Sequence, residues 1–242
     1  MVNWQAHPAS VAREIDYNAV SADFVGPLRP KVENETGMHV AYYTGAAGNT
    51  NKDSRIESEK HNMGYKAYGE KIAEEVIANI PNLKVVEGSG IQTTKLDFDA
   101  EIDHSWDHMI KEANEVFDLW KTVGKTEGDN LGKTYGFTSS YQARAIRTRY
   151  DKPATEVRQL RAFRVGPIGF TTGTYEMFSD HAEYVKENSP FEITVVITGC
   201  SGYIPNKAAY DYRSYESDTG FYASGTGEKM AEEYVKLLNA VK

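Results

Sequence analysis

The sequence contains little of several features that define whole classes of protein. It has one cysteine, Cys200, so no disulfide can form within the chain and nothing in it requires an oxidising compartment. No apolar run approaches the roughly 18 residues of a membrane-spanning helix. Basic residues are in deficit, 27 Lys and Arg against 35 Asp and Glu, which argues against a nucleic-acid or anionic-membrane partner. With no repeat, linker or secretory leader visible, the default expectation is one cytoplasmic domain.

What is present suffices for a globular core, because 40% of the 242 residues are hydrophobic. Periodicity and turn residues predict an α/β protein whose mixed sheets are flanked by helices. The order of the strands cannot be read from the sequence, and 125–133 is polar enough to predict a loop. The expected strands are 38–44, 83–86, 93–98, 157–163, 168–172 and 192–198, and the expected helices are 57–80, 102–123, 139–150, 181–187 and 226–241.

Small-residue turns follow three of the expected strands. Gly45 begins the first, which runs to Asn51; Gly173 begins the second, with Glu176 just beyond it; Gly199 begins the third, which contains Tyr203. Small residues at a strand end let backbone amides approach a ligand, and α/β folds place their sites at the carboxyl ends of strands. These turns therefore indicate a ligand site, although each is also explained as a tight turn.

A pair of histidines, His104 and His108, lies four residues apart on an expected helix, beside Asp103 and Asp107. Residues at this spacing share a helix face and could bind a metal. The pair lacks the glutamate of the H-E-x-x-H motif, however, so two solvated histidines beside carboxylates are the favoured interpretation.

An ordered series of short motifs resembles the neutral/alkaline non-lysosomal ceramidase family, in particular its short bacterial members. The similarity runs over nearly the whole chain and is expected to begin partway through the family's catalytic domain, so that residues 1–242 would be its central and C-terminal portion. The matching segments are, in chain order, Asn3-Trp4-Gln5-Ala6-His7-Pro8, Ser21-Ala22-Asp23-Phe24, Gly45-Ala46-Ala47-Gly48-Asn49, Tyr175-Glu176-Met177-Phe178, Gly202-Tyr203-Ile204-Pro205, Tyr215-Glu216 and Gly225-Thr226-Gly227-Glu228.

This resemblance implies a zinc-dependent hydrolase of an amide bond. The family holds zinc with two histidines, a glutamate and a tyrosine, and a serine near the metal takes part in the chemistry. By motif, the second histidine matches His7, the glutamate matches Glu176 and the tyrosine matches Tyr203. One nitrogen and two oxygen donors suit zinc. Gly48, Asn49 and Thr50 are expected to line the substrate site.

Two departures from the family pattern qualify these expectations. Asn51 stands at the serine position, and an asparagine can donate a hydrogen bond to an oxyanion but cannot act as an activated hydroxyl. The family's first zinc histidine lies upstream of the His7 motif, so an upstream segment or a partner chain is expected to complete the site. A degenerate site is the remaining alternative.

The expected substrate is a small-molecule or lipid-like amide, and it need not be ceramide. Two alternatives stay open. One is a non-catalytic protein that keeps the family fold and binds a small polar ligand at the strand-end turns. The other is a hydrolase of a sugar or another polar substrate, suggested by the arginines of 139–150 and by the many tyrosines.

Overall fold

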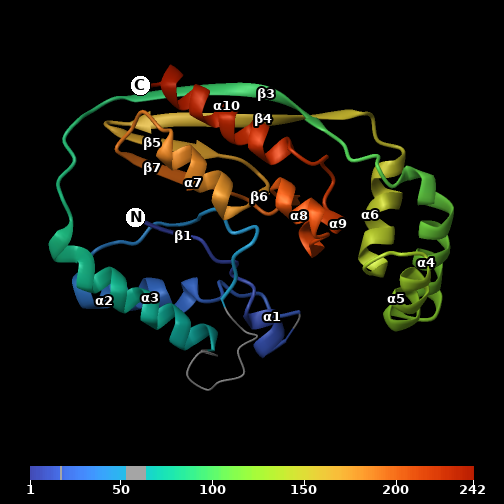
Figure 1. Ribbon diagram of the computed structural model, residues 1–242. Coiled ribbons are helices and arrows are strands. Elements are labelled where there is room, and N and C mark those ends of the chain that lie inside the picture. Colours follow the sequence, from blue (N-terminus) through green and yellow to red (C-terminus); the bar gives the residue numbers. More distant parts are fainter. Residues whose placement is uncertain (17, 53–63) are drawn as a thin grey trace.

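The computed structural model describes residues 1–16, 18–52 and 64–242 and contains three small β-sheets and ten α-helices within those ranges (Figure 1). Two single-turn 3₁₀ segments are present as well, Ile80–Asn82 and Asp107–Met109. The strands are β1 Val2–Trp4, β2 Tyr42–Thr44, β3 Ile91–Glu101, β4 Thr155–Val165, β5 Ile168–Thr172, β6 Glu176–Met177, β7 Ile193–Ile197 and β8 Tyr203–Ile204. The helices are α1 Val11–Glu14, α2 Val25–Thr36, α3 Tyr65–Asn79, α4 Ile110–Thr122, α5 Lys125–Thr134, α6 Ser140–Tyr150, α7 Ser179–Glu187, α8 Lys207–Asp211, α9 Tyr215–Thr219 and α10 Thr226–Ala240.

The largest sheet has the strand order β3-β4-β5-β7. β3, β4 and β5 pair antiparallel, whereas β5 and β7 pair parallel, so the sheet is mixed. Helices α7 and α10 lie on one face of it (Figure 1). The predicted class, mixed sheets flanked by helices, is confirmed. None of the helices within the described ranges is both long and apolar enough to cross a membrane.

Alternation along β3 explains which face of this sheet is buried. Lys95, Asp97 and Asp99 are exposed on one face, while Leu96 and Phe98 pack into the core on the other. Such a period of two is typical of a sheet with one wet face and one packed face. Across the ladder Leu96 pairs with Leu160, which is completely buried, and the core continues into α10.

The N-terminal part of the chain adds a second, smaller unit. β1 and β2 pair parallel, and α2 packs along α3 around Phe24, Leu28 and Ile72. This unit joins the large sheet at β7, where the Thr198 amide donates to the carbonyl of Thr44 over 3.1 Å. The ends of β2 and β7 are therefore held side by side.

Helices α4, α5 and α6 form a lobe at one end of the molecule (Figure 1). The prediction of a loop at 125–133 was wrong, because α5 occupies this segment. α5 packs closely against α4 because it has a glycine at the contact, and it has no apolar stripe. A Cβ added at Gly128 would lie 2.8 Å from the Cβ of Trp120. Close helix contact of this kind leaves no hydrophobic periodicity in the sequence.

Most other predicted elements are present with shifted ends. The strands expected at 93–98, 157–163, 168–172 and 192–198 are β3, β4, β5 and β7, and the last predicted helix is α10. The strand expected at 83–86 was wrong, since these residues form no strand and Val85 is 91% exposed. The helix predicted to start at 57 is observed from Tyr65, and 57–63 lie outside the described residues.

Candidate functional site

The three strand-end turns predicted to mark a ligand site meet at one place. The hydroxyl of Thr198 donates to the carbonyl of Gly45 over 2.6 Å, which joins the turn after β7 to the turn after β2. The amide of Ser201 donates to the carbonyl of Thr174 over 2.8 Å, which joins the turn after β7 to the turn after β5. Segments distant in sequence thus form a single edge of the fold, where α/β proteins place their ligands.

Two of the predicted zinc ligands are paired directly by this arrangement. Glu176 begins β6 and Tyr203 begins β8, and the two residues are partners in a parallel ladder. The Glu176 amide donates to the carbonyl of Gly202 over 2.8 Å, which fixes the register. The Tyr203 hydroxyl donates to the Glu176 carboxylate, so both side chains point to the same side of the pair.

The third predicted ligand, His7, comes from the segment after β1. A parallel backbone bridge joins His7 to Asn51, and the His7 amide donates to the carbonyl of Thr50 over 3.2 Å. Its Nε2 lies 3.2 Å from Oε2 of Glu176, and its ring stands edge-on to the ring of Tyr203 with centroids 6.3 Å apart. The structure therefore brings His7, Glu176 and Tyr203 together, although they span most of the chain.

Burial dominates the electrostatics of these three side chains. It lowers the pKa of His7 below the ordinary 6.5, against a smaller opposing effect of the Glu216 charge, so the imidazole is neutral near pH 7. Burial raises the pKa of Glu176, which hydrogen bonds from Tyr203 and from the backbone at Gly202 partly offset. Burial, followed by the nearby Glu176 charge, raises the pKa of Tyr203 well above its ordinary value. Negative charge is thus costly here, and a bound cation would relieve that cost.

The donor set fits a zinc ion in chemistry and in one geometric detail. Nε2 of His7 is buried, and within the described part of the chain no group meets it at hydrogen-bonding angles, despite its closeness to Glu176. Buried polar atoms are normally satisfied, so this nitrogen is available to coordinate a metal. Across residues 1–16, 18–52 and 64–242, no three His, Cys, Asp or Glu side chains cluster as a metal site. A zinc ion held here would therefore need the Tyr203 hydroxyl as its third donor.

The loop 48–51 runs alongside these residues. The Gly48 amide donates to the carbonyl of Met177 over 2.8 Å, and a Cβ at Gly48 would lie 2.6 Å from the carbonyl oxygen of Glu176. Only a glycine permits this approach. The Thr50 hydroxyl donates to the carbonyl of Gln5, and this hydrogen bond fixes the loop to the segment after β1.

The two asparagines of this loop differ in how they are used. Oδ1 of Asn49 accepts from the Ser179 amide at the start of α7 over 2.8 Å, while the side chain stays exposed. Asn51 is exposed and lies beside His7 through the backbone bridge. Their predicted parts in substrate binding and in chemistry remain predictions.

A fourth group, Glu216 in the first turn of α9, was given no role from the sequence. Its charge acts on His7, Glu176 and Tyr203 alike, raising the pKa of each. Glu216 belongs to the Tyr215-Glu216 motif of the family resemblance, and that motif was the available signal. What it did not reveal is that α9 packs against β8 beside the site.

The histidine pair at 104 and 108 does not converge. Nδ1 of His104 lies 2.7 Å from Oδ2 of Asp107, and the His108 ring stacks on Trp106 with centroids 6.2 Å apart. His108 lies in the 3₁₀ turn that precedes α4, and His104 comes before that turn, so the two do not share an α-helical face. The favoured interpretation of the pair, histidines beside carboxylates, agrees with this geometry.

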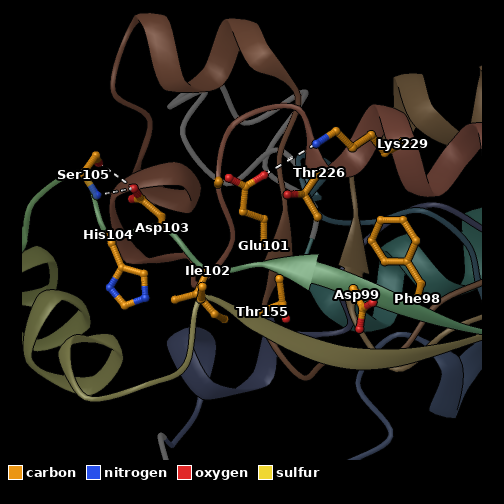
Figure 2. A pocket seen from close by; sticks show the side chains of 12 residues that line it. Phe98, Asp99, Glu101, Ile102, Asp103, His104, Ser105, Thr155, Thr226 and Lys229 are labelled. Atoms are coloured by element: carbon orange, nitrogen blue, oxygen red, sulfur yellow. Dashed lines mark hydrogen bonds and ion pairs between the residues drawn. The ribbon is translucent and has the colours of Figure 1, made fainter.

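A shallow cavity of about 500 Å³ lies beside His104, at the end of β3 (Figure 2). Two of its carboxylates already have partners: Lys229 lies 3.5 Å from Glu101, and both the amide and the hydroxyl of Ser105 donate to Asp103. This cavity is separate from the His7 site and contains none of the predicted ligands.

Comparison with known proteins identifies solved structures with a similar fold. No family model matches the sequence, and no curated protein matches it significantly. The crystal structure of neutral ceramidase from Pseudomonas aeruginosa is similar, with a TM-score of 0.64 and 14% identity over 98% of this chain and 43% of that one. A ceramidase complexed with C2 is similar at a TM-score of 0.61 and 15% identity, over 98% and 44%. The chain thus spans less than half the length of these ceramidases, and its fold is ceramidase-like.

Proposed function

We propose that this chain is part of a ceramidase-like, zinc-dependent hydrolase of an N-acyl amide bond. One observation carries the proposal: the three residues that match the family's zinc ligands converge at the meeting point of the strand-end turns. The Nε2 atom of His7 is buried there without a hydrogen-bond partner among the described residues. The family's known activity enters through the resemblance, because a fold can host many reactions.

In this proposal, His7, Glu176 and Tyr203 hold the metal. Bound zinc would polarise the amide carbonyl and lower the pKa of a coordinated water towards about 7. The lowered pKa of His7 keeps its imidazole in the neutral form that a metal requires. The ladder between β6 and β8 orients Glu176 and Tyr203 before any ligand binds, so little ordering remains to be done.

The remaining predicted residues act on the substrate. Asn51, next to His7, would donate from its side-chain amide to the oxygen of the reacting carbonyl. An asparagine provides no nucleophile, so water has to attack the carbon. Gly48 and Thr50 position the loop, and the amide nitrogen of Asn49 can point to the substrate while its oxygen caps α7.

A second function, binding of a small polar ligand without catalysis, is favoured by one observation. Asn51 replaces the serine that takes part in the family's chemistry, so the fold and the pocket could persist without turnover. This alternative predicts ligand-dependent stabilisation with no hydrolysis of acyl amides, even when zinc is added.

Zinc content and amide hydrolysis together test the proposal. We expect about one zinc per chain in the wild type after dialysis against zinc, and zinc-dependent release of amine from N-acyl amides. His7→Ala and Glu176→Gln should each lower zinc affinity by more than about 100-fold, because even outer-shell changes cost 10- to 100-fold. His104→Ala is the matched control and should retain the metal. Undiminished zinc in both ligand variants would overturn the metal site, and zinc binding without hydrolysis would favour the binding protein.

A further inference from the structure

A second cavity, of about 240 Å³, lies against Tyr203 between α6 and the segment formed by β8 and α9. Because Tyr203 also belongs to the proposed metal site, this cavity adjoins the position of the reacting amide. Its principal side chains come from three segments and are Tyr141, Arg144, Thr148, Tyr203, Tyr215 and Phe221.

Aromatic rings connect the metal site to this cavity. The ring of Tyr203 is in edge-on contact with both His7 and Tyr215, with centroid distances of 6.3 Å and 6.1 Å. Tyr215 in turn meets Tyr141 edge-on at 6.0 Å. Edge-to-face contacts of this kind form stiff walls. A substrate group that extends past Tyr203 therefore enters a preformed aromatic cavity.

One charged residue lines the cavity among the residues that the structure describes, and it is Arg144. The other arginines of α6 are engaged: Arg147 lies 3.7 Å from Asp118, and Arg149 is buried against Asp103 at 2.9 Å. Arg144 is exposed, and no described carboxylate forms an ion pair with it. Its charge reaches the cavity wall, where it acts on the hydroxyl of Tyr215.

Negative charge is placed unevenly around Tyr215. The negative charge of Glu216 also raises the pKa of the Tyr215 hydroxyl. Glu216 does not line the cavity, however, and its charge acts on Glu176 in the proposed metal site as well. An anionic group would be repelled on that side and attracted on the side of α6. A guanidinium without a partner presents a planar fork of donors that matches a carboxylate.

We propose that this cavity binds a carboxylate carried by the substrate, a few bonds from the amide that is cleaved. The inference rests on the proposed function and narrows its substrate to anionic amides, as distinct from neutral lipid amides. The carboxylate can belong to the amine part, as in an N-acyl amino acid, or to the acyl part, as in a succinamic acid. Arg144 is then a specificity-determining residue, and the aromatic rings line the cavity beside it.

Binding measured by calorimetry on zinc-free protein tests the cavity independently of catalysis. N-hexanoylglycine and its neutral counterpart N-hexanoylglycinamide differ only in the charged group, and N-hexylsuccinamic acid places the carboxylate on the acyl side. We expect the wild type to bind at least one of the two anions about tenfold or more tightly than the neutral amide, as charge-assisted hydrogen bonds allow.

Variants on the same helix identify the residue responsible. Arg144→Gln should reduce binding of the anion to the level of the neutral amide and leave zinc content unchanged, whereas Arg147→Gln should leave both unchanged. Equal binding of anion and neutral amide, or equal losses in the two variants, would overturn the inference. Hydrolysis of neutral and anionic amides at equal rates would overturn it while leaving the proposed function intact. Arg144-dependent binding of the anion by a chain that takes up no zinc when zinc is supplied would support the inference about the cavity and overturn the proposed zinc-dependent function.

Discussion

The chain places histidines in two settings that differ in how they are built. His7 meets Glu176 and Tyr203, which are far away in sequence, at an edge formed by three strand-end turns. His104 finds its partner, Asp107, only three residues away. The second setting has the more familiar spacing of a metal motif, yet in the first the three proposed ligands converge. A spacing of four residues has a geometric meaning only where the segment is an α-helix.

The two settings also differ in the hydrogen bonding of their histidine ring nitrogens. Nε2 of His7 is buried and lies 3.2 Å from Oε2 of Glu176, but it meets no described group at hydrogen-bonding angles, whereas Nδ1 of His104 is hydrogen-bonded to Oδ2 of Asp107 over 2.7 Å. A buried polar atom without a partner is destabilising unless something binds it. The unpartnered ring nitrogen of the first setting is a feature that is typical of functional sites.

The largest loss of stability is expected when the backbone that holds the His7 setting is disrupted. Gly48→Ala would place a Cβ 2.6 Å from the carbonyl oxygen of Glu176, and backbone atoms cannot easily move aside. We expect a loss of about 3 kcal/mol in the free energy of unfolding, at the upper end for overpacking, together with loss of zinc binding.

Gly26→Ala is the matched control for that variant. The new Cβ would lie 3.9 Å from the Cβ of Ala22, in ordinary contact, and Gly26 belongs to helix α2. Stability should stay within about 1 kcal/mol of the wild type, on the stabilising side. Urea denaturation measures both variants, and equal stabilities would show that the loop is not held against β6 as described.

An intermediate effect is expected in the helical lobe, which is held by local contacts. Asp129 accepts hydrogen bonds from the amide and the hydroxyl of Ser140, over 2.8 Å and 2.7 Å, and so joins α5 to α6. Burial opposes the charge of Asp129, but the hydrogen bonds from Lys125 and Ser140 outweigh it and lower the pKa to about 2. Asp129→Ala should cost about 1–3 kcal/mol, since Ser140 is completely buried.

The lowered pKa also gives this contact a pH dependence of known sign. A carboxyl group with a depressed pKa stabilises the protein above its unfolded pKa of about 4 and ceases to do so as the pH falls through about 2. The urea midpoint of the wild type should therefore fall more than that of Asp129→Ala between pH 5 and pH 2. Asp118→Ala, at a side chain that is 71% exposed, should behave like the wild type. Parallel curves for the wild type and Asp129→Ala would contradict this role.

The smallest effect is expected at the local histidine pair. His108→Ala removes a ring stacked on Trp106, and His104→Ala removes a part-exposed contact with Asp107. Each should change the free energy of unfolding by about 0.5 kcal/mol and leave zinc content untouched. A loss of bound zinc in either variant would contradict the claim that zinc binds at His7 and not at the histidine pair.

The sequence predicts the periodic elements well. β5 has the predicted ends, and β4, β7 and α10 differ from prediction by only a few residues, because each buries a regular apolar face. α6 also lies close to its predicted ends, although its buried face includes Gln142 and Arg149. α5 was missed because it packs through Gly128 against Trp120 and through Gly132 against Phe137, and no hydrophobic pattern records such contacts. The strand expected at 83–86 was wrong because its β-branched residues remain exposed, and propensity without burial does not make a strand.

The candidate site was less accessible to sequence reasoning. β6 and β8 have two residues each, so no periodicity can reveal them. His7, Glu176 and Tyr203 were found through the family resemblance, and only the tertiary structure shows that they meet. Three features arise only from packing between distant segments: the unpartnered Nε2 atom of His7, the position of the Glu216 charge, and the cavity at Arg144. No local sequence pattern predicts them.

Anomalous diffraction at the zinc edge, from crystals of the full chain grown with zinc, tests the central claim most directly. We predict one strong peak enclosed by Nε2 of His7, the carboxylate of Glu176 and the hydroxyl of Tyr203, at about 2.0–2.2 Å from each donor. A map with no peak at this position, or with its peak between His104 and Asp107, would contradict the claim.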